Sequence, residues 1–168
     1  MVFIVIGIAV IALAVYLGFR IYHKIQQKQT AEKNTATLPA FSFYTLNNTV
    51  FTNNNLPDSN GKIIFNFFSP TCEHCQYMAT QYVQHQQQLN GITILMITVA
   101  DSLAVTEFYK QYTLNQVPNI IMLRDKKFSF PKIFGTGVVP CFFIYNHQKL
   151  VKKIIGETKM ENLISSEP

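Results

Sequence analysis

Cysteine is scarce in this sequence: the 168 residues include only three cysteines, Cys72, Cys75 and Cys141. An odd number leaves one thiol outside any pair, and three cysteines are too few for a domain that is stabilised mainly by disulfide bonds. A structural zinc site needs four ligands, commonly as two spaced pairs. The chain has one Cys-x-x-Cys and no second pair at zinc spacing, so we expect no metal site.

A concentrated basic surface is also missing. The formal net charge is +5. Four of the positive charges follow the N-terminal apolar run: Arg20, Lys24, Lys28 and Lys33. The lysines beyond them are scattered, with small clusters at 126–127 and 152–153. Because a nucleic-acid interface needs a basic stripe with residues that contact the bases, we do not expect nucleic acid as a partner.

Polar residues are absent from the start of the chain. Residues 2–19 contain no charge, Asn, Gln or Pro. As a helix, this run with Met1 would be roughly 28 Å long, close to the bilayer hydrocarbon thickness of about 30 Å. A core helix would show a polar face, and a signal peptide would show a basic start and small residues before its cleavage site. We therefore predict an uncleaved membrane anchor over residues 1–25, with Tyr16 and Tyr22 available to the interface.

The rest of the chain divides into a tether and one domain. Residues 26–38 are rich in Gln, Lys, Thr, Ala and Asn and predict a polar tether, while residues 39–168 have the length of a single domain. In this domain we expect a hairpin at 41–52, strands at 62–68, 92–99 and 119–123, helices at 72–89, 101–112 and 128–134, a hairpin at 141–155 and a last helix ending near 164. Alternating strands and helices predict an α/β domain with a partly parallel sheet.

The most informative motif is Cys72-Glu73-His74-Cys75, which follows the apolar strand 62–68. We expect Thr71 to cap a helix here, and residues i and i+3 lie on the same face of a helix. Two sulfurs so placed can close or open a small disulfide ring with little backbone movement. The helix N-terminus favours a thiolate at the first cysteine. The motif therefore predicts a redox dithiol that exchanges electrons with disulfides of other proteins.

Taken together, these motifs resemble the thioredoxin-like superfamily, and within it the membrane-anchored thiol-disulfide oxidoreductases of the TlpA/ResA type. The resemblance covers residues 38–164. It rests on segment 38–43, on segment 65–75 with its strand, turn and CxxC, on the additional helix and strand at 101–123, and on Val139-Pro140 with strand 142–145. It implies a thioredoxin fold with an N-terminal β-hairpin and a central helix-strand insertion, preceded by one transmembrane helix.

The same resemblance implies roles for site residues. Cys72 would be the attacking cysteine and Cys75 the resolving one. Pro140 would be a cis-proline beside the dithiol, in a loop with Val139 that presents backbone to the partner peptide. A thiol-disulfide exchange of this kind needs no cofactor, but a reductase needs an external electron donor.

The two residues between the cysteines are expected to tune the dithiol. A cationic His74 would stabilise the Cys72 thiolate and make the disulfide more oxidising. Glu73 acts in the opposite direction through like-charge repulsion. We therefore expect a redox potential that is intermediate, and more oxidising than that of thioredoxin.

The chain departs from the family pattern in several places. Met78 stands where members that serve cytochrome c maturation carry a Glu, which weakens an assignment to haem-protein maturation. The usual Trp before the active site is absent, and Pro70-Thr71 occupies that turn. Cys141 could form an alternate disulfide, but a strand cysteine is more often a small buried hydrophobe.

Other functions stay open beside a membrane-anchored oxidoreductase that acts in cell redox homeostasis. A peroxiredoxin-like antioxidant enzyme would carry Thr three positions before its cysteine, where this chain has Ser69. A copper module of the Sco type would carry CxxxC and a distal His, and residues 135–139 contain no His. A redox-inactive interaction domain would not need both cysteines.

The membrane orientation rests on two opposed arguments. Every basic residue near the anchor follows it, which by the positive-inside tendency favours a cytoplasmic domain. The family resemblance instead implies an extracytoplasmic domain, periplasmic in a bacterium, and disulfides form in such compartments. We expect a single-pass protein of the cell membrane that faces outward, with the cytoplasmic orientation as the alternative. Its expected partners are protein disulfides or dithiols, an electron donor and the lipid bilayer through residues 1–25.

Overall fold

The structure is a computed structural model that describes residues 2–58 and 61–165, without the side chains of residues 2–12, 24, 27–29 and 31. The helices are α1 (Val2–Thr35), α2 (Glu73–Gln84), α3 (Ser102–Gln111), α4 (Phe130–Phe134) and α5 (Met160–Ile164). The strands are β1 (Ser42–Thr45), β2 (Val50–Thr52), β3 (Lys62–Phe67), β4 (Ile92–Thr98), β5 (Ile120–Arg124), β6 (Cys141–Asn146) and β7 (Lys149–Ile155).

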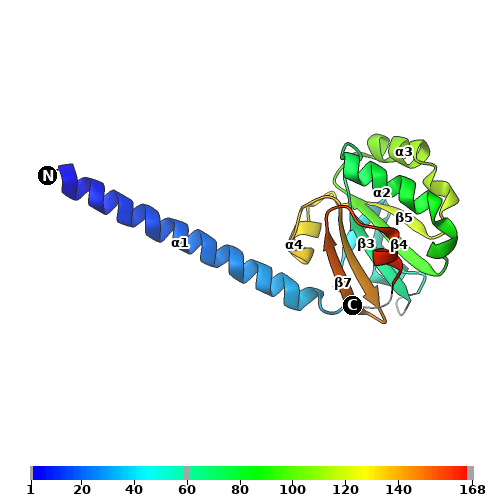
Figure 1. The fold of residues 1–168 in the computed structure, drawn as a ribbon, viewed down its shortest axis with the longest axis horizontal. Helices are drawn as coiled ribbons and strands as arrows, with labels where there is room; N and C mark the ends of the chain where they lie inside the picture. Colours follow the sequence, from blue (N-terminus) through cyan, green and yellow to red (C-terminus); the bar gives the residue numbers. More distant parts are fainter. Residues whose placement is uncertain (1, 59–60, 166–168) are drawn as a thin grey trace.

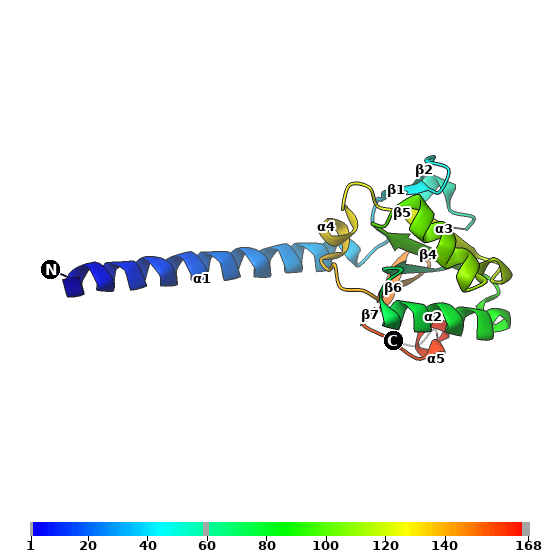
Figure 2. The same cartoon turned by 90° about the horizontal axis from the view of Figure 1, so that it is seen from above.

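The strands form one mixed sheet in the order β2-β1-β5-β4-β3-β6-β7 within the described residues. Strands β3, β4 and β5 are parallel, and β1, β2, β6 and β7 add antiparallel pairs at the two sides. One apolar cluster joins the sheet to α2, α3 and α5, and a second cluster on the other face joins it to α4. The sheet is thus the middle layer of the domain (Figures 1 and 2).

This arrangement confirms a thioredoxin-like α/β fold. The two central strands are almost entirely buried, as expected for parallel strands covered on both faces. The N-terminal hairpin is β1–β2, and the central insertion consists of α3 and β5, which precede β6. Asp101 caps α3 by accepting a 2.9 Å hydrogen bond from the backbone N–H of Ala104.

The helix that carries the dithiol differs from the sequence expectation at both ends. Cys72, not Thr71, is its N-cap residue, and α2 ends at Gln84. The Thr71 hydroxyl lies 3.1 Å from the Ser69 hydroxyl within the preceding turn, so it does not cap the helix. Beyond Gln84 the chain continues as a 3-10 helix over Gln86–Leu89, so the expected single helix is two shorter ones.

The expected polar tether is helical through Thr35, because α1 continues without a break from Val2. Its C-terminal end joins the domain, where the Tyr145 hydroxyl donates a 2.9 Å hydrogen bond to the Thr35 carbonyl. The next residues pair with the edge of β7, since Leu150 N–H donates to Ala36 O at 3.0 Å. The rest of α1 projects from the domain (Figure 1).

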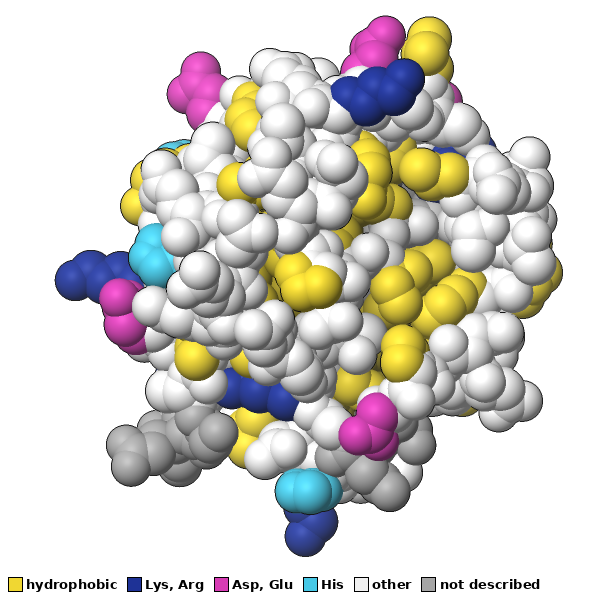
Figure 3. Space-filling view, turned by 90° about the vertical axis from the view of Figure 1, so that its right-hand side faces the viewer, with side chains coloured by type: hydrophobic (Ala, Val, Ile, Leu, Met, Phe, Trp, Pro, Cys, Tyr) yellow, Lys and Arg dark blue, Asp and Glu magenta, His cyan; other side chains and the backbone are white. Residues whose placement is uncertain are grey.

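The predicted membrane anchor covers residues 1–25, and the side chains of residues 1–12 lie outside the part of the chain that the structure describes. No helix long and apolar enough to cross a bilayer is found in the described part of the chain. On α1, the apolar side chains that are described, from Leu13 to Ile25, are exposed. On the opposite side of the molecule, charged residues of both signs lie around a central group of apolar side chains (Figure 3).

Candidate functional site

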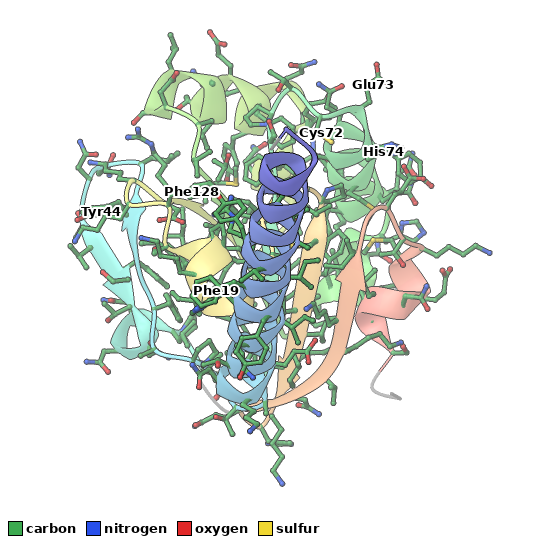
Figure 4. All side chains as sticks on the ribbon, turned by 90° about the vertical axis from the view of Figure 1, so that its left-hand side faces the viewer. Phe19, Tyr44, Cys72, Glu73, His74 and Phe128 are labelled. Atoms are coloured by element: carbon green, nitrogen blue, oxygen red, sulfur yellow. The ribbon has the colours of Figure 1, made fainter. Side chains whose placement is uncertain are left out.

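The two cysteines of the CxxC motif lie where β3 passes into α2. Cys72 is the N-cap of α2 and is partly exposed, whereas Cys75 lies one turn later and is buried. The backbone N–H of Cys75 donates a 2.9 Å hydrogen bond to the Cys72 carbonyl, which closes the first turn. Both cysteines are free thiols. This end of α2 faces the side of the domain from which α1 projects (Figures 2 and 4).

The cis-proline loop is adjacent to Cys72. The Val139-Pro140 peptide bond is cis, and the Cys72 thiol makes a long hydrogen bond of 3.8 Å to the Val139 carbonyl. On its other side, the Pro140 carbonyl accepts a 2.8 Å bond from the Gly156 N–H. The Val139 carbonyl and the partly exposed Cys72 sulfur therefore lie side by side, where a partner polypeptide could approach.

The two thiols differ sharply in environment. Burial raises the pKa of the Cys75 thiol from 9.0 to about 12, and the neighbouring Cys72 adds to this rise. The Ser69 backbone N–H, 3.5 Å from Cys75 Sγ, acts in the opposite direction. Cys75 is therefore a protonated thiol at neutral pH, and the accessible sulfur is that of Cys72.

The two residues between the cysteines are both exposed, and His74 has a partner from a distant part of the chain. His74 Nδ1 lies 2.8 Å from Oε2 of Glu157, a residue in the segment after β7. Glu73 occupies the exposed first position of α2. Sequence analysis missed Glu157, and no local signal could have identified it, because the contact joins residues 83 positions apart.

A second pair that sequence analysis missed lies inside the domain. Asn66, near the C-terminal end of β3, donates a 3.0 Å hydrogen bond from Nδ2 to the Tyr82 hydroxyl of α2. Both side chains are buried. A polar residue inside the otherwise apolar run 63–68 was the available signal.

Cys141 belongs to a different apolar cluster from Cys75, although it lies near enough to contribute to the raised pKa of the Cys75 thiol. It opens β6 opposite Phe67 and belongs to the apolar cluster beneath α4, whereas Cys75 belongs to the cluster beneath α2. The Cys141 side chain is fully buried, and burial raises its pKa to about 12. These surroundings are those of a small buried hydrophobe.

The comparisons with known proteins agree with this architecture. A thiol:disulfide interchange protein from Chlorobium tepidum is 18% identical, with a TM-score of 0.63 over 77% of this chain and 94% of that chain. StoA from Bacillus subtilis is 18% identical, with a TM-score of 0.57 over 76% and 96%. Peroxidoxin BcpB from Mycobacterium tuberculosis is 15% identical, with a TM-score of 0.62 over 77% and 90%. At these identities the likeness shows the shared fold.

Among curated proteins, no sequence matches the chain significantly. The family comparison is decisive, because the Thioredoxin family model matches residues 42–136, more than half of the chain. The matched segment begins at β1 and includes the dithiol, α2, the central insertion and α4. This chain therefore belongs to the thioredoxin family.

Proposed function

We propose that the protein is a membrane-anchored thiol-disulfide oxidoreductase that reduces or exchanges disulfides of protein substrates through Cys72 and Cys75. The observation that carries the proposal is the asymmetry of the dithiol. A partly exposed sulfur at a helix N-cap lies beside the 139–140 loop, and a buried thiol lies one turn behind it. An accessible nucleophile and a protected resolving thiol are what such exchange requires.

The reduction of one substrate disulfide needs no metal or organic cofactor. The Cys72 thiolate attacks a partner disulfide, and one partner sulfur leaves as a thiol after it takes up a proton. Cys75 then attacks Cys72 Sγ, which releases the second partner sulfur and leaves the Cys72–Cys75 disulfide. The substrate has gained two electrons and two protons, and a donor dithiol must return them before the next cycle.

The anchor is the second part of the proposal. Residues 2–19 supply the apolar run, and in the described part of α1 the apolar side chains are exposed. If this run spans a bilayer, residues 20–35 would hold the domain ~24 Å from the membrane. Because the dithiol end of α2 is on the side of α1, Cys72 would face the membrane surface (Figure 2).

Trapping of the mixed disulfide tests the exchange reaction. Cys75→Ser leaves the attacking sulfur but removes the resolving one, so protein partners should remain covalently bound and be released by reductant. Cys72→Ser is the matched control and should trap none. A Cys75→Ser protein that never forms a mixed disulfide with a protein that carries a disulfide would contradict the proposal.

Peroxide reduction is the second candidate, because one of the structures with this fold is a peroxidoxin. The Ser69 and Thr71 hydroxyls hydrogen-bond to each other in the turn before Cys72, so two hydroxyls lie in the segment that leads into the dithiol. Measurement of peroxide consumption by the reduced protein separates the two functions. Turnover with peroxide that exceeds turnover with protein disulfides would favour the antioxidant activity, and stoichiometric copper binding would favour a Sco-like module.

Membrane attachment and orientation need separate measurements. The full chain should resist alkaline extraction from membranes, and a reporter fused after Pro168 should be active only on the extracytoplasmic side. Release of the chain by alkali would contradict the anchor. A reporter active only in the cytoplasm would reverse the proposed orientation.

A further inference from the structure

We propose that Tyr82, oriented by Asn66, is the buried hydrogen-bond donor that stabilises the Cys75 thiolate in the resolving step. Asn66 is the positioning residue, because it acts through Tyr82. Both side chains are buried between β3 and α2, outside the CxxC motif. The inference rests on the proposed function, since it concerns the second of the two thiol attacks described above.

The first observation is the position of Asn66 in the sheet. Its neighbours in register, Met96 and Phe142, both belong to the apolar cluster beneath α2. Asn66 therefore faces α2, and its side chain is 1% exposed. The carboxamide is a strongly polar group in an apolar layer, where polar groups are costly unless they are hydrogen-bonded.

The second observation is that the hydrogen bonds of this pair are incomplete. Asn66 Oδ1 is buried without a hydrogen-bond partner among the described residues. The Tyr82 hydroxyl accepts from Asn66 Nδ2, and within the described chain this is its one hydrogen bond. The hydroxyl hydrogen is therefore free to be donated. If the carboxamide were turned over, the free hydrogens would be on its nitrogen instead, so the pair keeps an unpaired donor either way.

The third observation relates the pair to the dithiol. Cys75 and Tyr82 are both buried on the inner face of α2 and are two helical turns apart. Side chains on a helix point toward its N-terminus, so the Tyr82 ring extends from its own turn toward that of Cys75. Burial is the main cause of the raised pKa of Tyr82, and, consistent with this arrangement, the nearby Cys75 adds to it.

The resolving step creates a need for such a donor. The buried Cys75 must lose its proton to attack, and its thiolate is then a charge in an apolar layer. The Ser69 backbone N–H is one donor to this sulfur, at a long 3.5 Å. Burial also raises the pKa of Tyr82, so its hydroxyl keeps its hydrogen over the working pH range. A hydrogen bond from Asn66 to that hydroxyl makes it a stronger donor.

The balance of the step is simple. The Cys75 proton leaves, the Cys75–Cys72 sulfur bond forms, and the bond from Cys72 to the partner sulfur breaks. The partner sulfur takes the electron pair and a proton. Tyr82 keeps its own proton throughout, because it donates a hydrogen bond and does not transfer the hydrogen.

A two-phase thiol assay tests the proposal on the purified full chain. The reduced protein is mixed with an aromatic disulfide that releases one coloured thiolate when Cys72 attacks and a second when Cys75 resolves. Tyr82→Phe should leave the first phase unchanged and slow the second about 10-fold, since hydrogen bonds to charged groups contribute about that much or more. In Tyr82→Phe, the pH at which the second phase becomes faster should also be higher than in the wild type.

Tyr145→Phe is the matched control. Tyr145 is another buried tyrosine whose hydroxyl makes one tertiary hydrogen bond, but it lies in the cluster on the other face of the sheet. Its loss should leave both phases unchanged. Asn66→Leu provides a second variant if Tyr82→Phe does not fold, and it should slow the second phase by a smaller factor.

The outcomes separate this inference from the proposed function. A wild-type protein without a second phase, or a Cys75→Ser protein that retains it, would contradict the exchange mechanism itself. A normal wild type with equal second-phase rates in Tyr82→Phe and Tyr145→Phe would overturn only the role of Tyr82. Equal slowing of both phases by Tyr82→Phe would also overturn it, because that result indicates a general structural effect.

Discussion

His74, which stands between the two cysteines, places its Nδ1 2.8 Å from Oε2 of Glu157. Glu157 follows Gly156, whose N–H bonds to the cis-proline carbonyl. The contact therefore joins the CxxC helix to the segment beside the cis-proline loop. Figure 4 shows Cys72, Glu73 and His74 together at this end of α2. Glu157 is thus connected to the first turn of α2 through His74, and Glu73 is exposed on the same turn.

The charges of the intervening pair should shift the redox potential in opposite directions. His74→Ala removes a side chain that, when protonated, would stabilise the thiolate, so the potential should become less oxidising. Glu73→Gln removes a repelling anion, so it should become more oxidising. Both groups are exposed, which limits each shift to on the order of 10–30 mV. Glutathione redox titration measures these shifts, and shifts of the same sign in the two variants would contradict the expectation.

Glu157 should act through His74. In Glu157→Gln the His74 ring loses its 2.8 Å carboxylate partner, so the potential should move in the direction of His74→Ala by a smaller amount. Glu161→Gln is a suitable control, because Glu161 is exposed on α5 and outside the His74 contact. The unfolding free energy should change by less than about 1 kcal/mol. A double variant with His74→Ala should show no additional shift from Glu157→Gln.

The reduced protein should lose stability in alkali. Burial raises the pKa of Cys75 and of Cys141 from 9.0 to about 12 in the folded protein. The unfolded chain therefore releases these protons first, and the stability contributed by the two protonated thiols is complete below pH about 9 and is lost as pH rises toward 12. Urea unfolding at a series of pH values measures this loss. Cys75→Ala should have a shallower alkaline slope, and an unchanged slope would contradict the assignment.

The aromatic core beneath α4 should govern stability without affecting the chemistry. Phe130 is fully buried and stacks on Phe67, with 4.4 Å between ring centroids. Phe130→Ala should cost about 3–5 kcal/mol of unfolding free energy. Phe128→Ala is the matched control: this ring is 55% exposed, so its loss should change stability by less than about 0.5 kcal/mol. In both variants the folded fraction should keep the wild-type rate of Cys72 attack.

Much of the fold could be predicted because it is encoded in local patterns. The continuous apolar strands β3 and β4 indicate a buried parallel sheet, and the CxxC spacing predicts a dithiol at a helix start. The boundaries of α2 were less predictable. Thr71 is a good N-cap residue by type, but its hydroxyl pairs with Ser69, and that competition depends on the conformation of the turn.

The parts of the site that sequence analysis missed are contacts between distant segments. Glu157 reaches His74 only because β7 pairs beside the cis-proline strand β6, and Tyr82 meets Asn66 only because α2 packs on β3. Such contacts depend on the packing of the whole sheet. The same holds for Cys141, whose separation from the dithiol depends on which face of β6 it occupies.

For this protein, the sequence alone was enough to predict the family, the dithiol and the order of strands and helices, because spacing and hydrophobic periodicity are local properties. Tertiary structure was needed to identify the surroundings of the two sulfurs. It buries Cys75 and Tyr82 on the inner face of α2, pairs Tyr82 with Asn66, leaves Cys72 partly exposed at the Val139 carbonyl, and places Glu157 against His74. These relationships arise from packing between residues far apart in the chain, which local patterns do not specify.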